Sequence, residues 1–263
     1  MKSCIRSVIL FFILSYCCCK KVIQVNLNDA APQIVIYGEV TDLPGPYQVS
    51  ITKTVNFSAT NIFPPVSGAG VTITDDKGLN DSLSETAPGI YNTHTFWQGI
   101  PGNTYTLSVL TSGKTYTAIS VMPPAVPLDS ITFQQNQNFS RKNTISVVPY
   151  FQDPPGIVNY YQFAEFVNDT PLNKTYIMND RLSDGKYFNL PLYDDSVHIY
   201  TGDLVTLYMY SIDANVYNYL NQMQQISNSA QSLTPANPGT NLSNGALGIF
   251  TVHTVVSKQR IYD

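Results

Sequence analysis

Short stretches in which apolar and polar residues alternate fill the chain between residues 33 and 122. Alternation with a period of two is clear in residues 104–109 and again in residues 114–119, and it predicts strands that bury one face. Ser112 and Gly113 separate these two stretches, so we expect a hairpin at this point. The pattern as a whole predicts a β-sandwich over residues 33–122.

The alternation stops at a proline-rich stretch, residues 123–128, which contains Pro123, Pro124 and Pro127. Proline has no backbone N–H to donate to a β-ladder, and its ring fixes φ. This stretch is therefore predicted to be a stiff linker. Strand patterns resume after it, which predicts a second β-rich domain over residues 129–263.

One helix is predicted in the second domain. Asp213 is a suitable N-cap, and apolar residues follow it at helical spacing: Val216, Tyr219, Leu220, Met223 and Ile226. We interpret this stripe as a packing face rather than a ligand site. Residues 204–210, just before it, are apolar on both faces, as expected of a central strand. The predicted fold class is all-β (mainly β), with a single helix.

The first eighteen residues have the layout of a lipoprotein signal peptide. Lys2 and Arg6 form a short basic region, and residues 8–14 form an apolar run. This layout is typical of a secretory signal. The run is too short to cross a bilayer, which takes about 20 residues.

The position of the cysteines adds a lipid anchor to this interpretation. All four cysteines lie in the first nineteen positions, and Cys17, Cys18 and Cys19 end the signal. A cluster at that place predicts an acceptor for acyl chains such as palmitate. We place the acceptor at Cys19, with residues 19–32 as a tether. Cys17 and Cys18 remain alternatives, as does a signal or uncleaved anchor in which the cysteines are ordinary apolar residues.

Composition excludes several classes of function. The remainder of the chain has no cysteine, which rules out a disulfide framework, a thiolate metal site or a cysteine nucleophile there. Charged residues make up 12% of the chain, about half the usual quarter. The net charge is −4 with no basic stripe, so nucleic acid is not an expected partner.

No catalytic constellation stands out in the sequence. The chain has three histidines, His94, His198 and His253, and they are far apart with no metal-binding spacing. There is no Gly-x-Ser-x-Gly nucleophile motif. We therefore predict no catalytic residues and no cofactor.

Two acidic groups contain oxygen ligands of the kind that calcium uses, but neither fits a twelve-residue calcium loop. Aspartate and asparagine are also the usual turn formers, so we expect turns here and predict no metal site. The residues are Asp75, Asp76, Asn80 and Asp81 in one group, and Asp180 and Asp184 in the other.

A loop near the C-terminus is the candidate binding segment. Residues 234–248 are rich in proline, asparagine and glycine, which suit left-handed turns and close backbone approach. The alternative is that this loop covers a sheet edge. The candidate binding residues are Asn237, Pro238, Asn241, Asn244 and Gly245.

A series of short motifs, each weak alone, is specific in its order and spacing. The first half contains Lys21-Val22-Ile23 after Cys19, Ile34–Gly38, Pro44–Tyr47, Gly68–Ile73 and Gly89–Tyr91. The second half contains Asp153-Pro154, Asn159–Tyr161, Asp180-Arg181, Asp184-Gly185, Asn237-Pro238 and Asn244–Gly248. With these motifs, nearly the whole mature chain resembles the Bacteroidota lipoproteins grouped as domain of unknown function 4249.

The resemblance implies an outer-membrane setting beside TonB-dependent receptors, with no established activity. The first domain, residues 33–122, also resembles transthyretin-like and carboxypeptidase-regulatory sandwiches through the motifs at Gly68–Ile73, Asp75–Gly78 and Gly89–Tyr91. Lys20 and Lys21 follow the acceptor where surface-exported lipoproteins of this phylum are thought to carry acidic residues. We therefore expect the protein to face the periplasm.

These features favour a non-enzymatic outer-membrane lipoprotein that assists a TonB-dependent receptor, by binding either its ligand or the receptor. One alternative is a structural or adhesive surface protein. Another is a hydrolase that acts on peptides or glycans.

Overall fold

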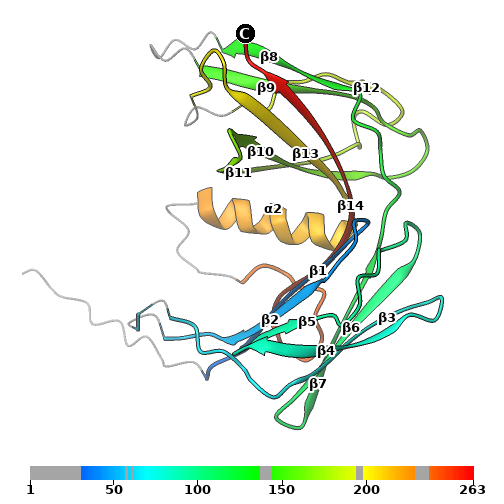
Figure 1. The fold of residues 1–263 in the computed structure, drawn as a ribbon, viewed down its shortest axis with the longest axis vertical. Helices are drawn as coiled ribbons and strands as arrows, with labels where there is room; N and C mark the ends of the chain where they lie inside the picture. Colours follow the sequence, from blue (N-terminus) through cyan, green and yellow to red (C-terminus); the bar gives the residue numbers. More distant parts are fainter. Residues whose placement is uncertain (1–30, 57–58, 61, 137–143, 194–197, 229–236) are drawn as a thin grey trace, which may run out of the picture.

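A computed structural model describes residues 31–56, 59–60, 62–136, 144–193, 198–228 and 237–263 (Figure 1). The first half of the chain forms β1 (Ile34–Thr41), β2 (Gln48–Lys53), β3 (Gly70–Asp75), β4 (Asn80–Ala87), β5 (Ile90–Asn92), β6 (Thr104–Thr111) and β7 (Lys114–Val121). The second half forms β8 (Ser130–Asn136), β9 (Thr144–Gln152), β10 (Tyr160–Val167), β11 (Thr170–Asn179), β12 (Tyr187–Phe188), β13 (Leu204–Ile212), helix α2 (Ala214–Asn228) and β14 (Leu247–Ile261). The mainly β fold class is confirmed.

The strands form one large and one small sheet. The large sheet has eleven strands in the order β11-β10-β13-β14-β1-β2-β5-β4-β3-β6-β7, and the small one has the order β12-β9-β8. The predicted central strand is confirmed, because β13 lies between β10 and β14.

The predicted hairpin at Ser112 and Gly113 is also confirmed. Both residues have positive φ, 50° and 71°, and β6 and β7 pair from Thr104↔Val121 to Thr111↔Lys114. Positive φ at both central positions gives a tight turn whose twist matches that of the strands.

The last strand, β14, joins the two halves of the molecule. Its first part pairs parallel with β1, from Val35↔Leu247 to Thr41↔His253. Its second part pairs antiparallel with β13, from Ser211↔Thr254 to Leu204↔Ile261. Figure 1 shows β14 running from beside β1 to the C-terminus at the far end of the molecule.

The described residues form two main hydrophobic clusters, and the chain passes from the first to the second over residues 122–128. Met122 packs in the first cluster, and Val126 and Leu128 pack in the second. The predicted domain division stays a prediction, and one feature departs from it. Phe250, far along the chain, is buried in the first cluster, so part of residues 129–263 completes the core of the first half.

The helix begins where the sequence predicts. The Asp213 carboxylate accepts a hydrogen bond from the backbone N–H of Val216 at 2.9 Å, as an N-cap does. Val216 is buried, and Tyr219 and Leu220 pack beside it. The end of the predicted packing stripe differs from expectation, because Met223 and Ile226 are each 41% exposed.

Candidate functional site

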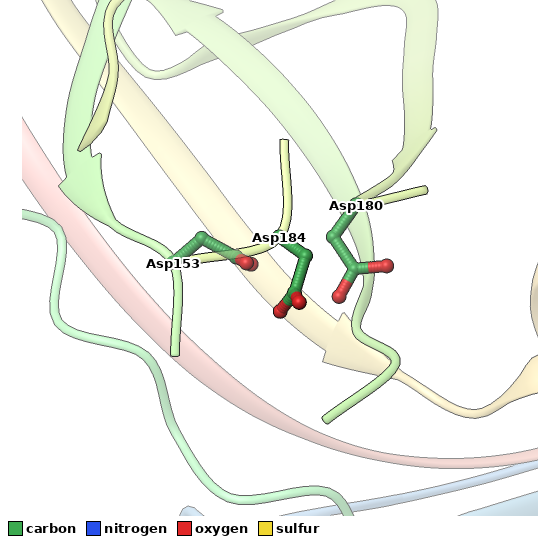
Figure 2. Close-up of side chains that lie close together, drawn as sticks. All are labelled: Asp153, Asp180 and Asp184. Carbon is green, nitrogen blue, oxygen red and sulfur yellow. The ribbon is translucent and has the colours of Figure 1, made fainter. Parts of the chain in front are cut away.

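Three carboxylates meet where β9 and β11 end. Asp153 follows β9, and Asp180 and Asp184 lie after β11. Figure 2 shows the three side chains converging from two segments. One oxygen from each lies within 4.8 Å of the others, and Asp153 and Asp180 are buried while Asp184 is exposed.

Each carboxylate accepts hydrogen bonds that hold the two segments together. Asp153 accepts from the Gly185 N–H at 3.0 Å, and Asp180 accepts from the Asn159 N–H at 2.7 Å. Asp184 adds a third contact of this kind, because it accepts from the N–H of Gly156 at 2.7 Å. The carboxylates of each segment thus accept hydrogen bonds from backbone amides of the other, and we call Asp153, Asp180 and Asp184 together the carboxylate brace.

A buried tyrosine strengthens this brace. The hydroxyl of Tyr161 donates to Asp153 at 2.5 Å. Burial raises the pKa of the Tyr161 hydroxyl far above its ordinary value, and the negative charge of Asp153 adds to the effect. The proton therefore stays on Tyr161 and remains available as a donor.

The sequence analysis identified Asp180 and Asp184 as possible oxygen ligands for calcium, but it did not include Asp153 in that group. Carboxylate oxygens from three residues are a donor set that a hard cation such as calcium accepts. The same oxygens already satisfy backbone amides, which accounts for their burial without an ion. Asp153 was missed because it lies in another segment of the chain, and no local spacing indicates that it meets Asp180 and Asp184.

The other acidic group forms a turn. Asp75 accepts from the N–H groups of Lys77 and Leu79 at 2.9 and 2.8 Å, and Asp76 accepts from the N–H of Thr104. Asp81 instead accepts from the indole N–H of Trp97 at 2.9 Å. These contacts are those of turn and packing residues.

An apolar groove lies beside the carboxylate brace. It has a volume of about 610 Å³ and lies between β11 and residues 182–193. Large apolar side chains on its walls are exposed: Leu182 is 90%, Leu190 61% and Tyr193 57% exposed. The brace fixes the start of the 182–193 segment, and so it positions one wall of the groove.

The candidate binding loop covers an edge of the sheet. The Asn241 side chain donates to the Phe250 carbonyl at 2.7 Å, and Asn244 donates to the Thr115 carbonyl of β7 at 2.7 Å. The Ser243 N–H also donates to Thr117 at 2.8 Å. These contacts match the alternative interpretation, a cover over β7.

The remaining loop residues have different surroundings. Asn237 and Gly245 are exposed, and Pro238 is half-buried. Asn244 and Gly245 both have positive φ, as expected for a tight turn. The structure therefore places the five candidate residues along one segment but not around the groove.

The sequence model described as "Domain of unknown function (DUF4249)" matches residues 20–259. The chain belongs to this family. No curated protein matches the sequence. Among solved structures, a two fibronectin type-III domain segment from chicken tenascin is similar at 11% identity, covering 88% of this chain and 99% of that chain, with a TM-score of 0.25.

The histidines of this DUF4249 protein lie in separate surroundings. His253 is buried, with Nε2 3.2 Å from Glu39 Oε1, and this contact with the imidazole lowers the pKa of Glu39. The ring of His198 stacks on Tyr200. No histidine belongs to a group of potential metal ligands in the part of the chain that the structure describes.

Of the three histidines, His94 has the contacts that most resemble those of a catalytic histidine. Its Nε2 lies 2.6 Å from Ser84 Oγ, and its Nδ1 lies 3.5 Å from Asp81 Oδ1. The order serine, histidine, aspartate is that of a hydrolytic triad. However, 55% of the His94 side chain is exposed, and Ser84 lies exposed in the middle of β4.

The predicted signal peptide and Cys19, with the alternatives Cys17 and Cys18, lie outside the described residues, as does most of the tether. Across the described ranges, no helix combines the length and the apolar character needed to span a membrane.

Proposed function

We propose that this protein is a non-enzymatic lipoprotein of the outer membrane that binds a partner through the groove between β11 and residues 182–193. The observation that carries the proposal is the exposed apolar lining of that groove. Monomeric proteins rarely expose clustered apolar side chains unless they bind something there. The anchor at Cys19 and the partner, a TonB-dependent receptor, come from the sequence and its family resemblance.

Co-purification tests the partner. We expect the tagged protein, extracted in mild detergent, to bring down a TonB-dependent receptor that mass spectrometry identifies. Leu190→Asp places a charge in the groove and should reduce recovery of the receptor at least tenfold. Leu110→Asp is the matched control, because Leu110 is 52% exposed on β6, away from the groove. Equal recovery with both variants would refute the role of the groove.

The anchor has a separate test. Mass spectrometry of the N-terminal peptide should show acyl chains on Cys19, and Cys19→Ser should release the protein from membranes without detergent. Protease added to whole cells should leave the protein intact, because we expect it to face the periplasm. Digestion by external protease would instead favour the structural or adhesive alternative.

A hydrolase is the second candidate, and one observation favours it: His94 lies between Ser84 and Asp81 in triad order. An activated serine would react with a fluorophosphonate probe, and Ser84→Ala would abolish that labelling. We expect no labelling of the native protein. The exposed histidine lacks the enclosed, water-excluding surroundings in which such groups act.

A further inference from the structure

Strand β11 forms one end of the eleven-stranded sheet. Its inner edge pairs with β10, and no strand of the described chain pairs with its outer edge. The Thr175 carbonyl accepts a hydrogen bond from the Gln224 side chain of α2 at 2.8 Å. Alternate residues of an antiparallel strand present N–H and C=O to the same side. Thr175 and Ile177 therefore direct their backbone groups outward.

Two hollows lie beside this edge, one toward each face of the strand. Tyr176 and Met178 pack against the second hydrophobic cluster and line the apolar groove. On the other face, Asn179 donates to the Tyr217 hydroxyl of α2 at 2.8 Å. A second hollow of about 630 Å³ lies there between β11 and α2. A strand laid along the edge would send alternate side chains into the two hollows.

Only part of β11 is protected against pairing. Pro171 and Lys174 lie in its first half, and proline and lysine on an edge discourage added strands. Residues 175–179 contain neither. These five residues extend about 17 Å at 3.4 Å per residue. An added strand would replace the hydrogen bond that the Thr175 carbonyl accepts from Gln224.

The charged side chains that line the two hollows are both lysines, which favour acidic groups on the occupant. The three carboxylates beside the apolar groove do not line it, and each already accepts a hydrogen bond from a backbone N–H. Lys186 lines the apolar groove and Lys174 lines the second hollow. Lys186 donates to the Leu182 carbonyl at 3.0 Å, and Lys174 donates to the Tyr193 carbonyl. Neither ammonium group forms an ion pair within the described residues.

We infer that β11 binds an extended segment of a partner protein as an added strand. The segment is apolar at its centre and carries acidic residues at its ends. Ladder hydrogen bonds to residues 175–179 provide the register, and the two hollows select alternate side chains. This inference rests on the proposed function, because the apolar groove is the site of both.

A labelled peptide tests the inference on the full chain. The probe is a seven-residue fluorescein-labelled peptide in which phenylalanine and valine alternate with threonine between two terminal aspartates. The control is the same peptide with N-methyl groups on alternate residues along the edge that would pair with β11. N-methylation removes ladder hydrogen bonds and leaves every side chain in place. We expect fluorescence anisotropy to show binding that weakens at least about tenfold on methylation.

Two variants of the protein test the same point from the other side. Ile177→Pro removes an outward N–H and should weaken binding at least about tenfold, whereas Ile177→Ala keeps that N–H and should weaken it by no more than about threefold. Circular dichroism checks that both variants fold. The peptide pair remains decisive where Ile177→Pro does not fold, because it leaves the protein unchanged.

The outcomes separate this inference from the proposed function. Equal binding of the two peptides would overturn strand addition but leave the groove as a binding site. Binding of neither peptide would overturn a peptide occupant, whereas a receptor that depends on Leu190 would still support the proposed function. Sedimentation that shows a dimer, dissociated by Ile177→Pro, would identify a second copy as the occupant and overturn the inference.

Discussion

A side chain at Gly248 of β14 would meet the backbone of β1, and its substitution tests how the two halves are joined. It pairs with Ile36 in the parallel ladder and has a φ of 98°. A Cβ atom at this position would lie 2.0 Å from the Ile36 carbonyl oxygen and 2.8 Å from the carbonyl carbon. Because these are backbone atoms, no side-chain rotation relieves the contact.

Gly245 provides the matched control. Its φ is 75°, but a Cβ atom there would meet no atom within 4 Å. Both alanine variants therefore carry the strain of a positive φ, about 1–3 kcal/mol. Gly248→Ala adds the overpacking of backbone against backbone, about 1–3 kcal/mol or more. We expect a loss of unfolding free energy of about 2–6 kcal/mol for Gly248→Ala and about 1–3 kcal/mol for Gly245→Ala.

Urea unfolding measures the difference. Trp97, the single tryptophan of the chain, packs against the first hydrophobic cluster, so its fluorescence reports on the half that β14 completes. The midpoint of the Gly248→Ala transition should fall well below that of Gly245→Ala. Equal midpoints would show that β1 and β14 can move apart at Ile36 at little cost in free energy, and would refute the reasoning.

Three further predictions concern single side chains. Hydrogen bonds from Ser67, Gly68 and Gly89 lower the pKa of Glu85 to about 2. The contribution of Glu85 to stability is therefore present above about pH 4.5 and is lost as pH falls toward 2. Glu85→Gln should reduce the dependence of the unfolding free energy on pH in that window. Tyr161→Phe leaves a buried oxygen of Asp153 without its donor and should cost about 1–3 kcal/mol in urea unfolding. Asp213→Ala removes both the cap of α2 and the acceptor of the buried Ser120 hydroxyl, and should cost about 2–4 kcal/mol, measured in the same way.

Each of these has a control. Asp169→Asn changes an exposed carboxylate in the turn between β10 and β11, and an equal reduction of the pH dependence there would contradict the role of Glu85. Tyr187→Phe removes an exposed hydroxyl that bonds Asp129 at 2.9 Å and should cost no more than about 0.5 kcal/mol. Asp213→Asn keeps a capping oxygen and should retain most of the stability, so a loss equal to that of alanine would argue against capping.

Local patterns in the sequence predicted the elements whose causes are local. The period-two alternation identified β6 and β7, the residues Ser112 and Gly113 identified their turn, and Asp213 identified the start of α2. In each case the physical cause lies within a few residues: side-chain alternation, positive φ, or a capped N–H. Of these signals only the hairpin turn identifies a partner strand, and that partner is the next strand along the chain.

The features that the sequence missed depend on distant pairing. The parallel ladder of β14 with β1 joins residues 35–41 to residues 247–253, and alternation in either strand does not say which strand lies next to it. The carboxylate brace was half-identified for the same reason, because Asp153 comes from another segment than Asp180. The groove is a property of β11 and residues 182–193 together, so no single stretch of sequence predicts it.

The order of strands connects the proposed anchor to the proposed binding edge. In the proposed arrangement the lipid is joined to β1 through the tether of residues 19–32, and the partner binds at β11. Between them the hydrogen-bonded order is β1, β14, β13, β10 and β11, so an unbroken series of ladders links the two ends. The proline-rich stretch at residues 123–128 is not part of that path. The position of the groove relative to β1 is therefore set by sheet pairing through β14, and Gly248 permits the first step of that pairing.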